Sequence, residues 1–212
     1  PGFNDPFHGP IKKIIYKNRR YISGSSIRLP SIYGMQFMVY GLTSTDINTD
    51  GKDEIVILDK DYRLRIYAAG GRVLVQSNEY YGHDPRMIDV GVKVDASEIV
   101  QEGEPVRFRG RLEFVRQGRH RYLLLPRNHS AGGSLLPGLA AIDTSGSIVI
   151  LGINREGFEK LFETRKQKGY VAAYQVTKAR GRRPARLHMA TVEEQAFGGE
   201  TISTIYTYAW KN

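Results

Sequence analysis

Four short apolar segments separated by turns, between residues 35 and 77, constrain the fold of this chain more than any other feature. The segments QFMVYGL, EIVIL, RLRIYAA and RVLVQS are rich in β-branched and aromatic residues, which favour strands. A polar loop, DINTDGKDE, follows the first segment, and a Gly70-Gly71 turn precedes the last. Connections this short join antiparallel neighbours, so the pattern predicts one four-stranded, up-and-down sheet.

The remainder of the chain continues the pattern of short strands and turns. Two extended stretches around Lys17, Asn18 and Arg19 predict a hairpin. Residues 80–104 are rich in Gly, Asp and Glu, and MIDVGVKV is the one strong strand expected in this insertion. Further strands are predicted at VRFRGRLEFV, YLLLP, AAIDTSGSIVILGI, GYVAAYQV, RLHMATVE and TISTIYTYAW, with RQGRHR and TKARGRRPA as loops. The segment FEKLFETRKQK could form about two helical turns, but its position after SIVILGI favours an outer strand.

Four short antiparallel strands within about 40 residues are typical of one blade of a β-propeller. We therefore expect an all-β fold, a complete or partial β-propeller whose four-stranded antiparallel blades carry long insertions. The single propeller-like domain spans 1–212 and comprises a half blade (11–29), a complete blade (35–77), an insertion (80–104), a degenerate blade (105–166) and a terminal blade (170–210). Closed propellers have about four to eight blades. The chain is therefore part of a longer propeller, an unusually small one, or a subunit that a partner completes, and the first and third are favoured.

The polar loop of the complete blade has the residue types and spacing of a calcium-binding loop. Ca²⁺ takes about six to eight hard oxygen ligands, and a glycine allows the sharp turn that wraps the ion. Oxygen-bearing side chains occupy loop positions 1, 3, 5 and 9, with Gly51 at position 6. The predicted ligands are Asp46, Asn48, Asp50 and Glu54, together with the backbone carbonyl of Lys52. Position 12 is Ile57 rather than Glu, which favours a loop flanked by strands over an EF-hand; the alternative is a metal-free, Asx-rich turn.

This loop resembles the FG-GAP or VCBS repeat, the calcium-loop blade of integrin-type β-propellers. The family pattern is an aromatic-Gly strand, then Asp-x-Asn/Asp-x-Asp-Gly-x-x-Asp/Glu, then a run of Ile, Val and Leu. Here the pattern is met by Tyr40-Gly41-Leu42, the loop from Asp46 to Glu54, and IVIL. The resemblance is specific over residues 28–77, moderate over 135–212 and poor over 80–110. It implies a bacterial, non-enzymatic, calcium-stabilised propeller module for protein or glycan binding and assembly, exported to the periplasm, cell surface or extracellular space.

Two further loops share the strand–loop–Gly–strand frame, with their glycines at Gly118 and Gly181. The positions that match the calcium ligands are Glu113, Val115, Gln117 and Arg121 in one loop, and Val176, Lys178, Arg180 and Pro184 in the other. These side chains cannot form a calcium cage. We therefore expect one Ca²⁺ per chain, with basic side chains near the equivalent places in the other two loops.

The basic residues are clustered, and the formal net charge is +9. Such clusters suit an anionic partner such as polysaccharide, an acidic protein face or, with less support, nucleic acid; the alternative is a solvated basic surface. The predicted patch comprises Arg107, Arg109, Arg111, Arg119, Arg121, Lys178, Arg180, Arg182 and Arg183.

The absence of several residue patterns from the sequence disfavours several functional classes. The chain has no cysteine, which excludes disulfide scaffolds, thiolate zinc sites and cysteine nucleophiles and is common in exported bacterial proteins. Its histidines are scattered without ligand spacing, and no apolar run is long enough for a transmembrane helix. The N-terminal segment lacks the pattern of a signal peptide and is interpreted as a mature, processed or trimmed end. Partners are expected to be another protein or a second copy, through unpaired sheet edges. The alternatives to a binding module are a propeller enzyme acting on anionic polysaccharide and a basic nucleic-acid-binding protein.

Overall fold

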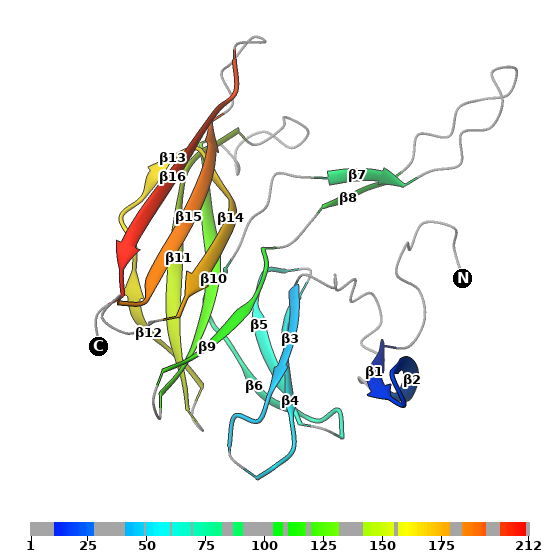
Figure 1. Ribbon diagram of the computed structural model, residues 1–212. Coiled ribbons are helices and arrows are strands. Elements are labelled where there is room, and N and C mark those ends of the chain that lie inside the picture. The colour runs from blue at the N-terminus through cyan, green and yellow to red at the C-terminus, as the bar shows by residue number, and fades with distance from the viewer. Residues whose placement is uncertain are drawn as a thin grey trace, which may run out of the picture.

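The computed structural model shows an all-β chain, and its described residues form strands and no α-helix (Figure 1). The structure describes residues 11–27, 41–48, 50–59, 61–68, 70–81, 87–90, 104–107, 110–117, 120–131, 142–154, 157–178, 184–193 and 200–210.

The first large sheet is the predicted meander. It contains β3 (Leu42–Thr45), β4 (Glu54–Leu58), β5 (Leu64–Tyr67) and β6 (Val73–Gln76), hydrogen-bonded in that order and antiparallel throughout. Every residue of β4 is buried, as its continuous EIVIL run requires. The first strand begins later than expected, at Leu42, and residues 35–40 lie outside the described residues.

The middle sheet is a second antiparallel meander, and it is the largest. Its order is β12 (Gly157–Glu163), β11 (Ile142–Asn154), β10 (His120–Ala131) and β9 (Glu113–Gln117). The short β13 (Gln167–Lys168) pairs with the far end of β11.

The terminal sheet has three strands among the described residues. They are β14 (Tyr170–Thr177), β15 (Arg186–Glu193) and β16 (Ile202–Ala209), in sequence order and antiparallel. All three were predicted, because their alternating apolar residues have the period of a half-buried strand.

Two hairpins stand apart from these sheets. The predicted N-terminal hairpin is formed by β1 (Ile11–Lys17) and β2 (Arg20–Ile27), joined by Asn18 and Arg19, which both have positive φ. That conformation matches the twist of a two-residue β-turn. In the second, β7 (Met87–Val90) of the predicted insertion pairs with β8 (Glu104–Arg107), most of which was assigned to the following blade.

The middle sheet separates two hydrophobic cores, which explains the uninterrupted apolar runs of β10 and β11. Leu123 and Leu125 face the β3–β6 sheet, and Val149 and Leu151 of β11 lie in the same core. The alternate residues of both strands, such as Leu124, pack instead against the terminal sheet. Three sheets are thus layered, with the β9–β12 sheet between the other two (Figure 1).

The terminal sheet is fixed to the middle sheet by buried polar contacts. The hydroxyl of Tyr174 lies 2.7 Å from the carbonyl oxygens of both Arg111 and Leu124, and its single hydrogen can be shared between these two acceptors. The amide of Val171 donates to Oδ1 of Asn128 at 2.8 Å. Burial raises the pKa of Tyr174 well above its ordinary value, so this hydroxyl remains a donor.

Two sequence predictions in the middle region are wrong. The run VRFRGRLEFV was predicted as one strand, but β8 and β9 belong to different sheets, and the chain between them is irregular at Gly110–Leu112. Gly110 lies against the ring of Pro126, where a side chain would clash, so this glycine marks a close crossing of two segments. The expected loop RQGRHR is mostly strand, because Gln117 and His120 already pair across a two-residue connection.

The choice between helix and strand for FEKLFETRKQK is settled in favour of the outer strand. Phe158, Lys160 and Phe162 lie in β12, which pairs with β11 at the sheet edge.

Candidate metal centre and neighbouring surfaces

The predicted calcium loop connects β3 to β4 and is organised around the carboxylate of Asp46. The amide of Asp50 donates to Oδ1 of Asp46 and the amide of Gly51 donates to Oδ2, both at 3.1 Å. Gly51 has φ of +82°, a conformation that favours glycine, as its place in the motif predicted. The loop therefore wraps around its first carboxylate.

Glu54 closes the other end of the loop. It is the first residue of β4 and is buried. Its Oε2 accepts a hydrogen bond from the amide of Ile47 at 2.7 Å, and its Oε1 accepts one from Nδ2 of Asn48 at 3.0 Å. The same Asn48 nitrogen donates to Oδ2 of Asp50 at 3.3 Å. The amide group of Asn48 therefore lies between two carboxylates that are four residues apart in the sequence.

The ligand types in this loop fit calcium, whereas their arrangement in the structure is a hydrogen-bonded turn. Asp50 accepts from the amide of Lys52 at 2.8 Å and donates its own amide to Oδ1 of Asn48 at 2.9 Å, so loop amides engage the oxygen atoms. Among the described residues, no group of three or more His, Cys, Asp or Glu side chains is arranged to hold a metal ion. Carboxylate, amide and carbonyl oxygens are nevertheless the hard ligands that Ca²⁺ prefers.

The three glycine loops occupy equivalent places in the topology. Each connects the first strand of a sheet to the second: β3 to β4, β9 to β10 and β14 to β15. The first and third connections have the same length, 46–53 and 178–185, whereas the second consists of residues 118–119 alone. Only the first combines this length with several oxygen-bearing side chains.

The predicted basic patch is only partly within the described residues. Arg111 is exposed, and its Nη2 lies 3.8 Å from Oε2 of Glu113. Arg121 lies on β10 opposite Arg116, and its Nη1 atom is buried without a hydrogen-bond partner among the atoms described. Lys178 is exposed beyond the end of β14, and Arg107 ends β8. The structure describes no placement for Arg109, Arg119, Arg180, Arg182 and Arg183.

Sequence reasoning missed a buried carboxylate at the turn between β4 and β5. Asp59 is fully buried, and its Oδ1 accepts hydrogen bonds from the amides of Asp61 and Arg63, both at 2.9 Å. Its Oδ2 accepts one from Nε of Arg65 at 2.8 Å. This turn also holds Tyr62 at a positive φ of 56°, which is uncommon for a residue with a side chain. The segment DKDYR lies between two predicted strands, and nothing in its local sequence indicates that its first carboxylate is buried.

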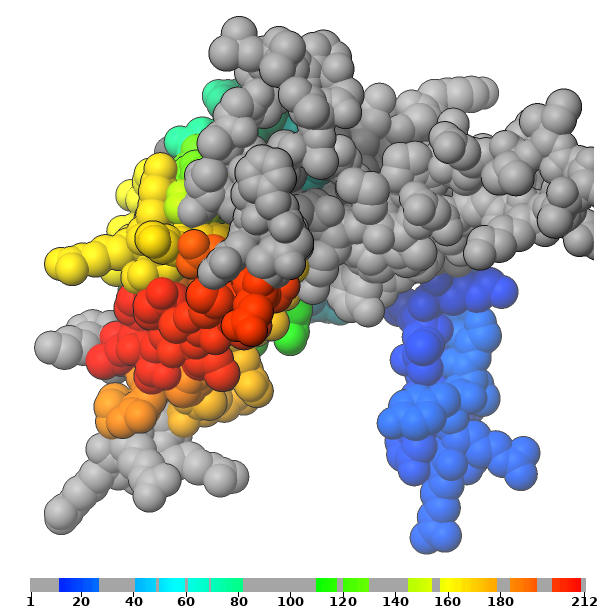
Figure 2. Space-filling view, turned by 90° about the horizontal axis from the view of Figure 1, so that it is seen from above, coloured from blue at the N-terminus to red at the C-terminus, as the bar shows by residue number. Residues whose placement is uncertain are grey.

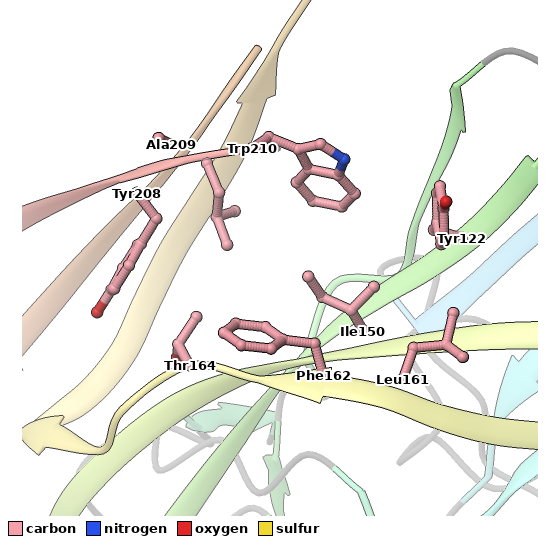
Figure 3. A pocket seen from close by; sticks show the side chains of 9 residues that line it. Tyr122, Ile150, Leu161, Phe162, Thr164, Tyr208, Ala209 and Trp210 are labelled. Atoms are coloured by element: carbon pink, nitrogen blue, oxygen red, sulfur yellow. The ribbon is translucent and has the colours of Figure 1, made fainter. Parts of the chain in front are cut away.

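An apolar cleft opens between β12 of the middle sheet and the C-terminal end of β16 (Figure 3). Its volume is about 340 Å³. Trp210 projects toward Tyr122 on one side, and Leu161 and Phe162 form the opposite wall (Figure 3). The rings of Tyr122 and Trp210 meet edge to face with centroids 5.7 Å apart.

The pKa values of two carboxylates in the middle sheet are shifted in opposite directions. Burial raises the pKa of Glu113, and the charge of Arg111 only partly offsets this effect. Burial also opposes ionisation of Glu163, but a 2.7 Å hydrogen bond from Ser147 Oγ and the charges of Arg127 and Lys160 outweigh it. The pKa of Glu163 is therefore lowered.

The chain matches no family model, no curated protein and no solved structure. Within its described residues, no helix is long and apolar enough to cross a membrane.

Proposed function

We propose that this chain is a calcium-stabilised, non-enzymatic module of FG-GAP or VCBS type, which binds a protein or glycan partner at the bacterial cell surface or in the periplasm. The observation that carries the proposal is the β3–β4 loop. It combines calcium-type ligands, a glycine at positive φ and a buried glutamate in one connection. The successive antiparallel meanders, packed face to face, are compatible with neighbouring blades of a propeller.

Calcium acts structurally in this proposal. Asp46, Asn48, Asp50 and Glu54 supply side-chain oxygens, and Lys52 supplies its carbonyl. A rotation of the Asn48 amide would turn its oxygen toward the space between Asp50 and Glu54, where its nitrogen now donates. A cation there would offset the repulsion between those two carboxylates. The ion would stabilise the β3–β4 connection and the two strands that it joins.

The assembly role rests on strand edges. β16 is the outer strand of a three-stranded sheet among the described residues, and it carries exposed apolar side chains. Exposed edges of this kind pair with other chains. The basic patch would favour partners that present acidic groups or anionic sugars.

The test is a calcium titration of the chelator-treated chain by calorimetry, combined with thermal unfolding. We expect one site per chain. At a calcium concentration about 100 times the Kd, binding stabilises the fold by about 2.7 kcal/mol. For a chain of this size, that corresponds to a rise in Tm of about 5–10 °C.

Variants separate the metal from the hydrogen bonds of the loop. Asp46→Ala and Asp50→Ala should abolish the calcium-dependent rise in Tm, whatever they do to the Tm of the metal-free chain. Lys178→Ala, in the equivalent third loop, should leave the calcium-dependent rise unchanged. A titration with no site contradicts the proposal, and two or more sites would show that the basic loops also bind metal.

A further inference from the structure

The N-terminal hairpin exposes large apolar side chains on both of its faces. Ile14 and Tyr21 are 75% and 77% exposed, and Tyr16 stacks against Tyr21 with ring centroids 5.0 Å apart. Ile15 and Ile22 pair on the opposite face and are also exposed. An isolated two-stranded hairpin is marginally stable in water, and burial of these side chains would stabilise it.

Among the described residues, no strand pairs with the outer edge of β16, and the backbone groups that point outward from this edge can be assigned. The amide of Trp210 donates to the carbonyl of Ala185, so residues 210, 208, 206, 204 and 202 form the hydrogen-bonded pairs with β15. Ser203, Ile205, Thr207 and Ala209 therefore direct their N–H and C=O groups away from β15. Ile205 is 73% exposed on the outer face of this edge.

The cleft beside β16 lies where β12 of the middle sheet is not covered by a strand of the terminal sheet among the described residues. The middle sheet has a fourth strand in its meander, β12, whereas within the described part of the chain the terminal sheet has three strands and β16 is its outer strand. Leu161 and Phe162 of β12 consequently remain 48% and 56% exposed in the cleft. One strand added to the free edge of β16 would cover them.

The hairpin and the β16 edge have complementary charge. Residues 11–27 contain five basic residues (Lys12, Lys13, Lys17, Arg19 and Arg20) and no acidic residue. At the start of β16, Glu193 pairs with Ile202 and Glu200 precedes the strand, whereas Arg186 pairs with Ala209 at the other end and Lys211 follows in the sequence. β16 itself contains no charged residue, so the two glutamates favour the basic turn of the hairpin as the occupant beside the start of the strand.

We propose that β1 of one copy adds antiparallel to the β16 edge of a second copy; this deepens the assembly role proposed above and rests on it. The Lys17–Arg20 pair closes a two-residue turn, so the N–H groups of Ile14 and Tyr16 point outward from the hairpin. Paired with β16, these two residues lie beside Ile205 on the outer face. Ile15 then faces Leu161 and Phe162, and the basic turn lies near Glu200.

The resulting interface is head-to-tail. The hairpin and β16 lie on different sides of the molecule, since both views place the hairpin at the right and β16 at the left (Figures 1 and 2). Because each copy offers one hairpin and one edge, the interface is heterologous and generates a ring or an open chain of copies.

The test uses two variants of the full chain, each blocked on one side. Ile205→Pro removes an outward N–H of β16, and Tyr16→Pro removes an outward N–H of β1, so neither change removes a bond within its own sheet. Native mass measurement should give multiples of the 23.9 kDa chain for the unmodified protein and a monomer for each variant alone. An equimolar mixture of the two variants should form a dimer and nothing larger, because one intact hairpin meets one intact edge.

Ser23→Pro is the matched control, since it places proline on the outward edge of β2 and should leave assembly unchanged. A monomeric unmodified chain, including one whose hairpin occupies its own β16 edge, would overturn the proposal. So would variants that still assemble, or a mixture that stays monomeric. A calcium titration of the monomeric variants tests the metal site separately, so failure of assembly and failure of calcium binding give different results.

Discussion

Replacement of Asp59 by Asn tests whether the buried carboxylate at the β4–β5 turn stabilises the first sheet. The change preserves size and keeps one oxygen for the amides of Asp61 and Arg63. It replaces the oxygen that accepts from Arg65 Nε at 2.8 Å with an NH₂ group or forces the amide to rotate. A hydrogen bond to a charged group contributes about 1.5–3 kcal/mol, and the burial of Asp59 leaves water little access to replace it.

We therefore expect Asp59→Asn to lower the free energy of unfolding by about 2–3 kcal/mol. The corresponding fall in Tm is about 4–12 °C for a chain of this size. Urea unfolding followed by circular dichroism at fixed protein concentration measures the change. Asp61→Asn is the control, because Asp61 is exposed, and its effect should stay within about 0.5 kcal/mol.

A double-mutant cycle with Arg65→Met isolates the ion pair from the turn. The combined variant should lose less stability than the sum of the two single changes, because neither partner is then left without the other. If Asp59→Asn costs less than about 0.5 kcal/mol, the contact between Asp59 and Arg65 does not stabilise the turn and this reasoning fails.

Acid unfolding should distinguish the effects of Glu163 and Glu113 on stability. The lowered pKa of Glu163 gives stability that is present above pH 4.5 and lost on acidification. Glu163→Gln should therefore flatten the acid limb of a plot of Tm against pH. The raised pKa of Glu113 has the opposite sign, since its ionisation in the fold costs stability as pH rises above 4.5; Glu113→Gln should therefore raise Tm at pH 7, and a fall there would contradict the assignment. Gly169→Ala should lower the free energy of unfolding by more than about 1 kcal/mol, because Gly169 has φ of +75° and the new Cβ would clash with the carbonyl of Val192 just before β14. Gly70→Ala is the control: its new Cβ would have no atom within 4 Å, so it should have little effect in the same urea unfolding assay.

The candidate calcium loop shows which structural features can be predicted from local sequence and which cannot. The glycine at positive φ and the wrapping of the loop around Asp46 follow from the order of residues within nine positions. Burial of Glu54 does not, because it depends on β4 being covered on both faces by other parts of the chain. For the same reason the role of Asp59 was invisible, since a turn aspartate in solvent and one beneath a sheet have the same neighbours in sequence.

The sequence by itself determined most of the strands outside residues 106–121, because a period of two and turn residues are local properties. The all-β class, the first meander, the outer strand β12 (Gly157–Glu163) and the three terminal strands were all predicted from these patterns. Tertiary structure decided which strands share a sheet, as the break at Gly110 shows: the flanking residues look like one strand, and the contact with Pro126 divides them. It also decided that Leu123 and Leu124, adjacent in one apolar run, belong to different cores. Those outcomes depend on contacts between residues distant in sequence, and the local pattern carries no information about them.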